Sequence, residues 1–143
     1  MNKLIFAAIF LSVFLGSAVN AEDISTDTVK LKINNTTFDV KLENNSATEE
    51  LINHLNDGNV TVEAADYGNF EKVGSLGFSL PTNDENIETA SGDIVLYQGN
   101  QISLFYESHS WSYTKIGKIQ NVSSDELKGI LGSGDVKLTF SLN

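Results

Sequence analysis

The residues best suited to chemistry lie in one polar and aromatic segment, residues 106–113. Tyrosine, histidine and tryptophan alternate there with serine, and a second aromatic group lies at residues 67–71. Tyrosine and tryptophan combine apolar area with a hydrogen-bonding group, which is typical of sites for peptides or small ligands. The sequence therefore predicts a ligand-binding groove formed by Tyr67, Phe70, Glu71, Tyr106, His109, Trp111 and Tyr113. Glu71 and Glu107 are predicted at its rim, and the alternative is that half of these rings pack in the core.

Nucleophilic catalysis and metal binding are not indicated. His109 is flanked by Ser108 and Ser110, but neighbours on a strand point to opposite faces, and no carboxylate is placed to orient the imidazole. The chain has two distant histidines and no cysteine, a poor set for a metal. The acidic loop at residues 83–85 does not have the spacing of an EF-hand. We predict no catalytic residue, no metal and no cofactor.

The charge of the chain excludes several partners. All nine basic residues are lysines, against 19 acidic residues, and the formal net charge is −10. An acidic surface repels phosphate backbones and has no attraction for anionic membranes. We therefore expect no nucleic acid and no membrane as partner, and a peptide, a small molecule or a partner protein instead.

The N-terminus has the pattern of a secretory signal peptide. Lys3 precedes an apolar run over residues 4–15, and small residues lead to a predicted cleavage after Ala21. The run is shorter than the ~20 apolar residues that span a bilayer. We predict a signal peptide at 1–21, a polar leader at 22–27 and one domain at 28–143, in a periplasmic or secreted protein. The absence of cysteine leaves its fold without disulfides.

Alternating hydrophobicity predicts most of the strands. Residues 28–33, 37–42 and 136–142 alternate, and each has one apolar face. Further strands are predicted at 59–64, through Phe78 and Leu80, and at 113–119. Residues 66–77 are interpreted as a structured loop, and residues 82–90 as an acidic loop.

The clearest hairpin covers residues 93–106. A two-residue turn at Gly99-Asn100 predicts that Tyr97 faces Ile102 and that Val95 faces Leu104. These four residues would then form one core face.

Two segments have helical period. Residues 46–57 begin with the capping-box pattern Ser46-Ala47-Thr48-Glu49 and end at Gly58. A shorter helix follows a cap at Ser123 or Ser124. About eight strands, two short helices and no βαβ rhythm indicate a mainly β, closed eight-stranded barrel with the aromatic groove at its mouth.

Four segments resemble the bacterial cyclophilin-like fold proteins, over about residue 28 to the end. They are residues 66–74, 76–81, 92–100 and 108–117. The resemblance implies an eight-stranded barrel closed by helices, in agreement with the periodicity. Cyclophilins are peptidyl-prolyl isomerases whose pocket places an arginine against the prolyl amide.

The sequence departs from the true cyclophilins at this catalytic arginine, because it contains no arginine. Lysine does not reproduce the planar guanidinium that stabilises the twisted amide. We therefore expect an exported binding module for a peptide or small ligand, without catalysis. The alternative is a weak or atypical prolyl isomerase that uses Gln98, Gln101 or His109 as donors.

Overall fold

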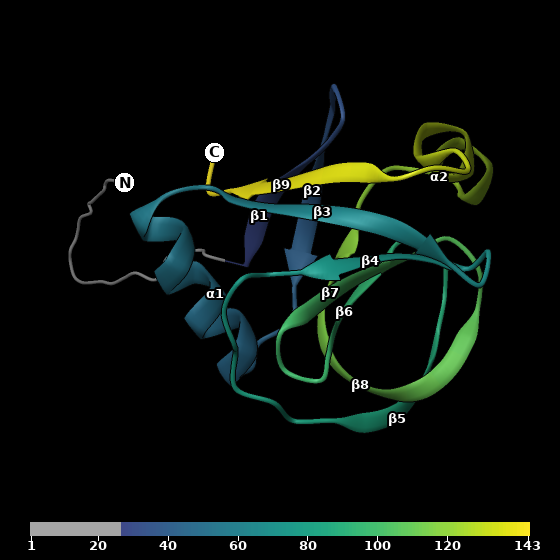
Figure 1. Cartoon of the computed structure of the whole chain (residues 1–143). Helices are drawn as coiled ribbons and strands as arrows, with labels where there is room; N and C mark the ends of the chain where they lie inside the picture. The colour runs from purple at the N-terminus through teal and green to yellow at the C-terminus, as the bar shows by residue number, and fades with distance from the viewer. Residues whose placement is uncertain (1–26) are drawn as a thin grey trace, which may run out of the picture.

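The computed structural model describes residues 27–143, in which eight antiparallel strands form a closed ring (Figure 1). The ring order is β2-β1-β9-β3-β4-β7-β6-β8, and pairing of β2 with β8 closes it. A further strand, β5, pairs with β8 alone among the strands of the described chain. The strands are β1 Thr28–Ile33, β2 Thr36–Leu42, β3 Val60–Tyr67, β4 Glu71–Ser75, β5 Glu85–Thr89, β6 Asp93–Tyr97, β7 Gln101–Phe105, β8 His109–Ile119 and β9 Val136–Ser141. The predicted mainly β fold with a closed set of eight strands is confirmed, whereas the predicted signal peptide lies outside the described residues.

Strand alternation fills the ring with aliphatic side chains. In β1 and β9 every second residue is buried, as predicted, and lysine, threonine or serine occupies the other face. The buried set of these two strands is Val29, Leu31, Ile33, Val136, Leu138 and Phe140. This core is continuous with residues from both helices.

The two helices pack on this core from opposite sides of the strands (Figure 1). Helix α1 spans Ser46–Asp57, and α2 spans Ser124–Leu131. The predicted cap at Ser46 is wrong, because Asn45 accepts from the Thr48 N–H at 2.9 Å and Thr48 Oγ1 accepts from the Asn45 N–H. Ser123 caps α2 as predicted. In residues 27–143, no helix is long and apolar enough to cross a bilayer.

The middle of the chain differs from the prediction in three places. Strand β3 continues to Tyr67, and β4 begins at Glu71, so the predicted loop at 66–77 is mostly strand. Residues 76–84 contain no strand, although one was predicted there. Strand β5 lies within the predicted acidic loop, because β8 offers it a partner edge.

The predicted register of the β6–β7 hairpin is wrong by one position. Tyr97 pairs with Gln101 rather than Ile102, so the turn has three residues. Gln98 and Gly99 both have positive φ, of 54° and 80°, which moves the tight turn one residue earlier than Gly99-Asn100. As a result, Val95 and Tyr97 lie on the opposite face from the core residues Ile102 and Leu104.

Strand β8 belongs to two sheets. Its C-terminal half pairs with β2 and β6 in the ring, whereas residues 109–113 pair with β5. This first half and β5 form a two-stranded ribbon that leaves the ring (Figure 1). A second, smaller apolar cluster lies between this ribbon and the outer face of the ring, and consists of Val95, Phe105 and Tyr113 with Phe70, Ile87 and Tyr97 packed against them.

Candidate ligand-binding site

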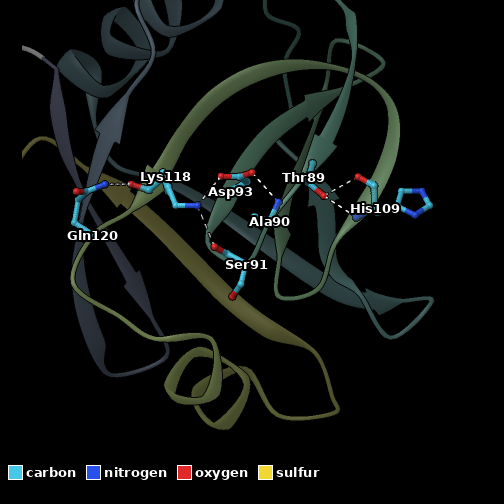
Figure 2. A network of polar contacts seen from close by, with 7 residues as sticks. All are labelled: Thr89, Ala90, Ser91, Asp93, His109, Lys118 and Gln120. Carbon is cyan, nitrogen blue, oxygen red and sulfur yellow. Dashed lines mark hydrogen bonds and ion pairs between the residues drawn. The ribbon is translucent and has the colours of Figure 1, made fainter.

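One wall of the candidate site comes from the first half of β8. His109, Trp111 and Tyr113 are two residues apart, so their side chains leave the same face of the strand. The ribbon is fixed at its end by Thr89, which exchanges hydrogen bonds with the backbone N–H and C=O of His109. Figure 2 shows these contacts, with the His109 imidazole pointing away from them. The imidazole is therefore free to line the site.

Asp93 anchors the segment between β5 and β6. Its carboxylate accepts from the Ala90 N–H at 2.8 Å and from Lys118 Nζ at 3.1 Å (Figure 2). Lys118 also donates to the Ser91 carbonyl at 3.3 Å. These bonds hold the base of the ribbon against the ring, which fixes the position of the wall.

The second wall is the turn between β3 and β4. Gly68 and Asn69 have φ of 65° and 60°, typical of a tight primed turn. A Cβ on Gly68 would lie 2.3 Å from the Phe70 ring, so glycine lets that ring fold back over the turn. Phe70 then stacks on His109, with centroids 4.0 Å apart, and Tyr67 meets the Phe70 ring edge-on at 5.8 Å.

Between these walls lies a cavity of about 570 Å³, which we call the aromatic cleft. Its volume is within the range of about 300–1,000 Å³ typical of small-molecule sites. It is lined by Tyr67, Phe70, Glu71, Val73, Tyr97, Gln101, His109, Trp111 and Tyr113. The cleft lies on the outer face of the ring, so the predicted position at the mouth of the barrel is wrong.

The cleft brings together six of the seven residues predicted for the site, all except Tyr106. Tyr106 packs against the main core, and its hydroxyl donates to the Asp66 carboxylate. Glu107 is not at the rim either, because it forms an ion pair with Lys128 of α2. Whether the six residues bind a ligand stays a prediction.

The predicted groove lacks three lining residues: Val73 and Tyr97, and Gln101, which the sequence indicated only as a donor for the alternative isomerase. Tyr97 and Gln101 face each other across the β6–β7 hairpin. The signal that would have found them is the turn itself: a turn centred on Gln98-Gly99 places both residues on the face opposite the core.

Glu71 forms the acidic floor of the cleft. Its side chain is buried, and Oε1 accepts a hydrogen bond from the Ser103 hydroxyl. Burial raises the pKa of the Glu71 carboxyl above its ordinary value, and the Ser103 hydrogen bond and nearby His109 oppose this shift only in part. A buried carboxylate that is difficult to ionise is typical of a functional position.

Glu71 is expected to make stability depend on pH. Its pKa is higher in the folded than in the unfolded chain, so the folded state holds the proton more tightly. In the wild type, the stability that the Glu71 carboxyl contributes is fully present below pH 4.5, the ordinary pKa of this group. It is lost as pH rises through the raised pKa of the folded state. Glu71→Gln removes this loss, so the unfolding free energy of the variant relative to wild type should increase with pH.

Urea unfolding at about pH 4 and about pH 8, on either side of the ordinary glutamate range, measures this difference. The control is Glu63→Gln, which makes the same charge change at an exposed position on β3 and should give a flat difference. If the unfolding free energy of Glu71→Gln relative to wild type stays flat or falls with pH, the raised pKa of Glu71 is contradicted.

Tyr113 places a buried hydroxyl in the cleft. The residue is 3% exposed, and burial, with the Glu71 carboxylate nearby, raises the pKa of Tyr113 to about 12. Within residues 27–143, the phenol has no hydrogen-bond partner in the protein. A buried hydroxyl without a partner is costly, so this group is available to a bound molecule.

The residues around His109 are not arranged as a serine–histidine pair that would activate a nucleophile. The neighbouring Ser108 hydroxyl donates to Glu88 at 3.2 Å, and the imidazole stacks on Phe70. No histidine–carboxylate ion pair involves His109 in the part of the chain that the structure describes. That same part contains no group of three acidic or histidine side chains able to hold a metal ion.

The described residues thus form a ring of eight antiparallel strands with two helices and an aromatic cleft outside the ring. The family model of the cyclophilin-like family matches residues 31–141. The chain therefore belongs to the cyclophilin-like family. No curated protein and no solved structure matches the chain significantly.

Proposed function

We propose that this chain is an exported cyclophilin-like domain that binds a peptide or small molecule in the aromatic cleft, without catalysing prolyl isomerisation. The observation that carries the proposal is the exposure of Trp111 and Tyr67, 59% and 62%, on the two walls of one cavity. They are the two large hydrophobic side chains exposed on the described chain. Exposed aromatic rings that converge on a cavity are typical of binding sites.

The chemistry of the cleft favours binding over isomerisation. Rotation of a prolyl bond has a barrier of about 18–20 kcal/mol. An arginine that donates to the amide nitrogen lowers it in cyclophilins, but this chain has no arginine, and the polar floor here is the carboxylate of Glu71. A carboxylate accepts hydrogen bonds and repels a partial negative charge on the twisted amide.

A specific observation keeps isomerisation as the second candidate. Gln101 and His109, two of the donors that sequence analysis considered, do line the cleft, whereas Gln98 does not. A protease-coupled assay on Ala-Pro peptides decides between the two. A rate above the uncatalysed one that disappears in His109→Ala but persists in His54→Ala would favour the isomerase. The control is matched, because His54 also stacks on a phenylalanine, at 3.7 Å.

Export and the excluded partners rest on the sequence. The leader pattern at 1–21 supports secretion or a periplasmic location. The net charge of −10 supports a soluble ligand or a partner protein over nucleic acid or an anionic membrane. Fractionation of the native host, with detection of a chain beginning after Ala21, tests this part of the proposal.

Trp111→Ala is expected to weaken ligand binding at least tenfold, about 1.4 kcal/mol, because it removes the largest ring of the cleft. Capped tetrapeptides and drug-sized fragments, screened by ligand-observed NMR, supply the ligands. Trp111 is the only tryptophan, so its emission reports binding to the wild type directly. His54→Ala is the control and should bind like wild type. Unchanged affinities in a folded Trp111→Ala variant would place the site elsewhere.

A further inference from the structure

The lining of the aromatic cleft has a one-sided charge. Glu71 is the one acidic residue among the lining side chains, and neither lysine nor arginine lines the cavity. The rest of the lining is aromatic, apart from Val73 and Gln101. A molecule that enters the cleft therefore meets a single carboxylate at the floor and aromatic rings around it.

Within the described chain, no lysine pairs with the Glu71 carboxylate, and the His109 imidazole is the one basic side chain that lines the same cleft. No ion pair of residues 27–143 includes Glu71, and its one hydrogen bond comes from Ser103. The next residue, Lys72, points to the opposite face of β4, because side chains alternate along a strand. Its ammonium is bound on that face by Asp66 at 3.2 Å and by the carbonyl of Gly134 at 2.6 Å. The nearest lysine in sequence is thus committed elsewhere.

A buried carboxylate without a counter-ion is costly, and a cation placed beside it removes the cost. The aromatic walls favour the same kind of group, because a cation is attracted to the face of Trp, Tyr or Phe within about 6 Å of the ring centroid. The free hydroxyl of Tyr113, close to Glu71, offers a further oxygen acceptor. The Glu71 carboxylate at the floor and the ring faces of the walls favour a positively charged guest.

We propose that the aromatic cleft binds the positively charged nitrogen of an organic ammonium ligand, held between the Glu71 carboxylate and the surrounding ring faces. This inference rests on the proposed function and names the chemical class of its ligand. Two sources share this chemistry, namely a free small amine and a lysine side chain of a peptide. The experiment has one arm for each.

The test compares cations with neutral isosteres of the same shape. In the first arm, calorimetry or NMR titration compares choline with 3,3-dimethylbutan-1-ol, which has carbon in place of the charged nitrogen. In the second arm, the peptide acetyl-Gly-Lys-Gly-amide is compared with its norleucine counterpart. All four probes are titrated into wild type, Glu71→Gln and Glu63→Gln, the last making the same charge change outside the cleft.

At least one cation is expected to bind wild type at least tenfold more tightly than its isostere. That ratio should fall to near one in Glu71→Gln and persist in Glu63→Gln. The arm that shows it identifies the source of the ammonium group. If Glu71→Gln fails to fold, Trp111→Ala is the second variant, because its exposed ring can be removed without opening the core. Trp111→Ala should weaken binding of the cation.

Three results would overturn the inference or a part of it. If isostere and cation bind equally, the cleft selects shape rather than charge, and the proposed function survives without this ligand class. If neither cation binds wild type, the ligand class is wrong, and the tetrapeptide and fragment screen then shows separately whether the cleft binds anything. A ratio that persists in Glu71→Gln would also overturn the assigned role of Glu71.

Discussion

Replacing Lys72 with methionine is expected to lower the free energy of unfolding by about 3 kcal/mol, a large share of the ~5–15 kcal/mol that stabilises a typical domain. Lys72 is fully buried. Its ammonium donates to the carbonyls of Gly132 and Gly134, at 3.0 and 2.6 Å, and lies 3.2 Å from Asp66. Methionine fills the space but leaves these acceptors unpaired, and unsatisfied buried acceptors are costly.

This network also explains why a lysine is buried at all. Gly132 follows the last residue of α2, so the ammonium lies at the helix end where carbonyls are unpaired and a cation is favourable. The hydrogen bond from Tyr106 and the ammonium of Lys72 hold the pKa of Asp66 below its ordinary value. Lys72 therefore joins β3, β4 and the end of α2.

Urea unfolding at neutral pH measures the change. The control is Lys30→Met, because the Lys30–Asp39 pair is close to half exposed and such pairs contribute about 0–1 kcal/mol. The double variant with Lys72→Met and Asp66→Asn should recover part of the loss, since it leaves no unpaired carboxylate. A Lys72→Met variant as stable as the Lys30→Met control would show that the network is energetically neutral.

The sequence predicts the ring because most of its strands have one buried face. In β1 and β9 the alternation of apolar and polar residues determines which side chains point inward. The β6–β7 hairpin lacks this information. Val95 and Leu96 are neighbours and both buried, so apolar residues on both faces allow two registers.

Strand β5 is hard to predict for a different reason. Its residues are mostly polar and exposed, and the segment is extended because the first half of β8 leaves the ring and pairs with it. A partnership between two segments some 20 residues apart is tertiary information that no local pattern contains. The same partnership forms one wall of the aromatic cleft, so the location of the cleft was also mispredicted.

Local patterns predicted the site where they follow a single strand. The two-residue spacing of His109, Trp111 and Tyr113 places them on one face wherever the strand runs. Tyr106 is predicted to line the same groove, but the chain bends between the end of β7 and the start of β8. The alternation restarts after that bend, so Tyr106 lies against the core.

Gly117→Ala is the second large effect expected, a loss of about 3 kcal/mol of unfolding free energy by overpacking. Gly117 lies opposite Leu42 in the β2–β8 pairing that closes the ring. A Cβ at this position would lie 2.5 Å from the Lys41 carbonyl oxygen and 3.0 Å from Val40 Cγ1. The carbonyl belongs to a paired strand and cannot move away as a flexible side chain would.

The matched control is Gly129→Ala in α2, where an added Cβ meets nothing within 4 Å. Alanine is a better helix former than glycine by about 1 kcal/mol, so this variant should be more stable than wild type. Urea unfolding measures the change in unfolding free energy for both variants. Opposite signs for the same chemical change would show that the close contact between β2 and β8, which we call the β2–β8 seam, determines the cost at Gly117. Equal effects of the two variants would mean that the β2–β8 seam relaxes freely. In that case β8 would not be held firmly enough to position His109, Trp111 and Tyr113 over the aromatic cleft.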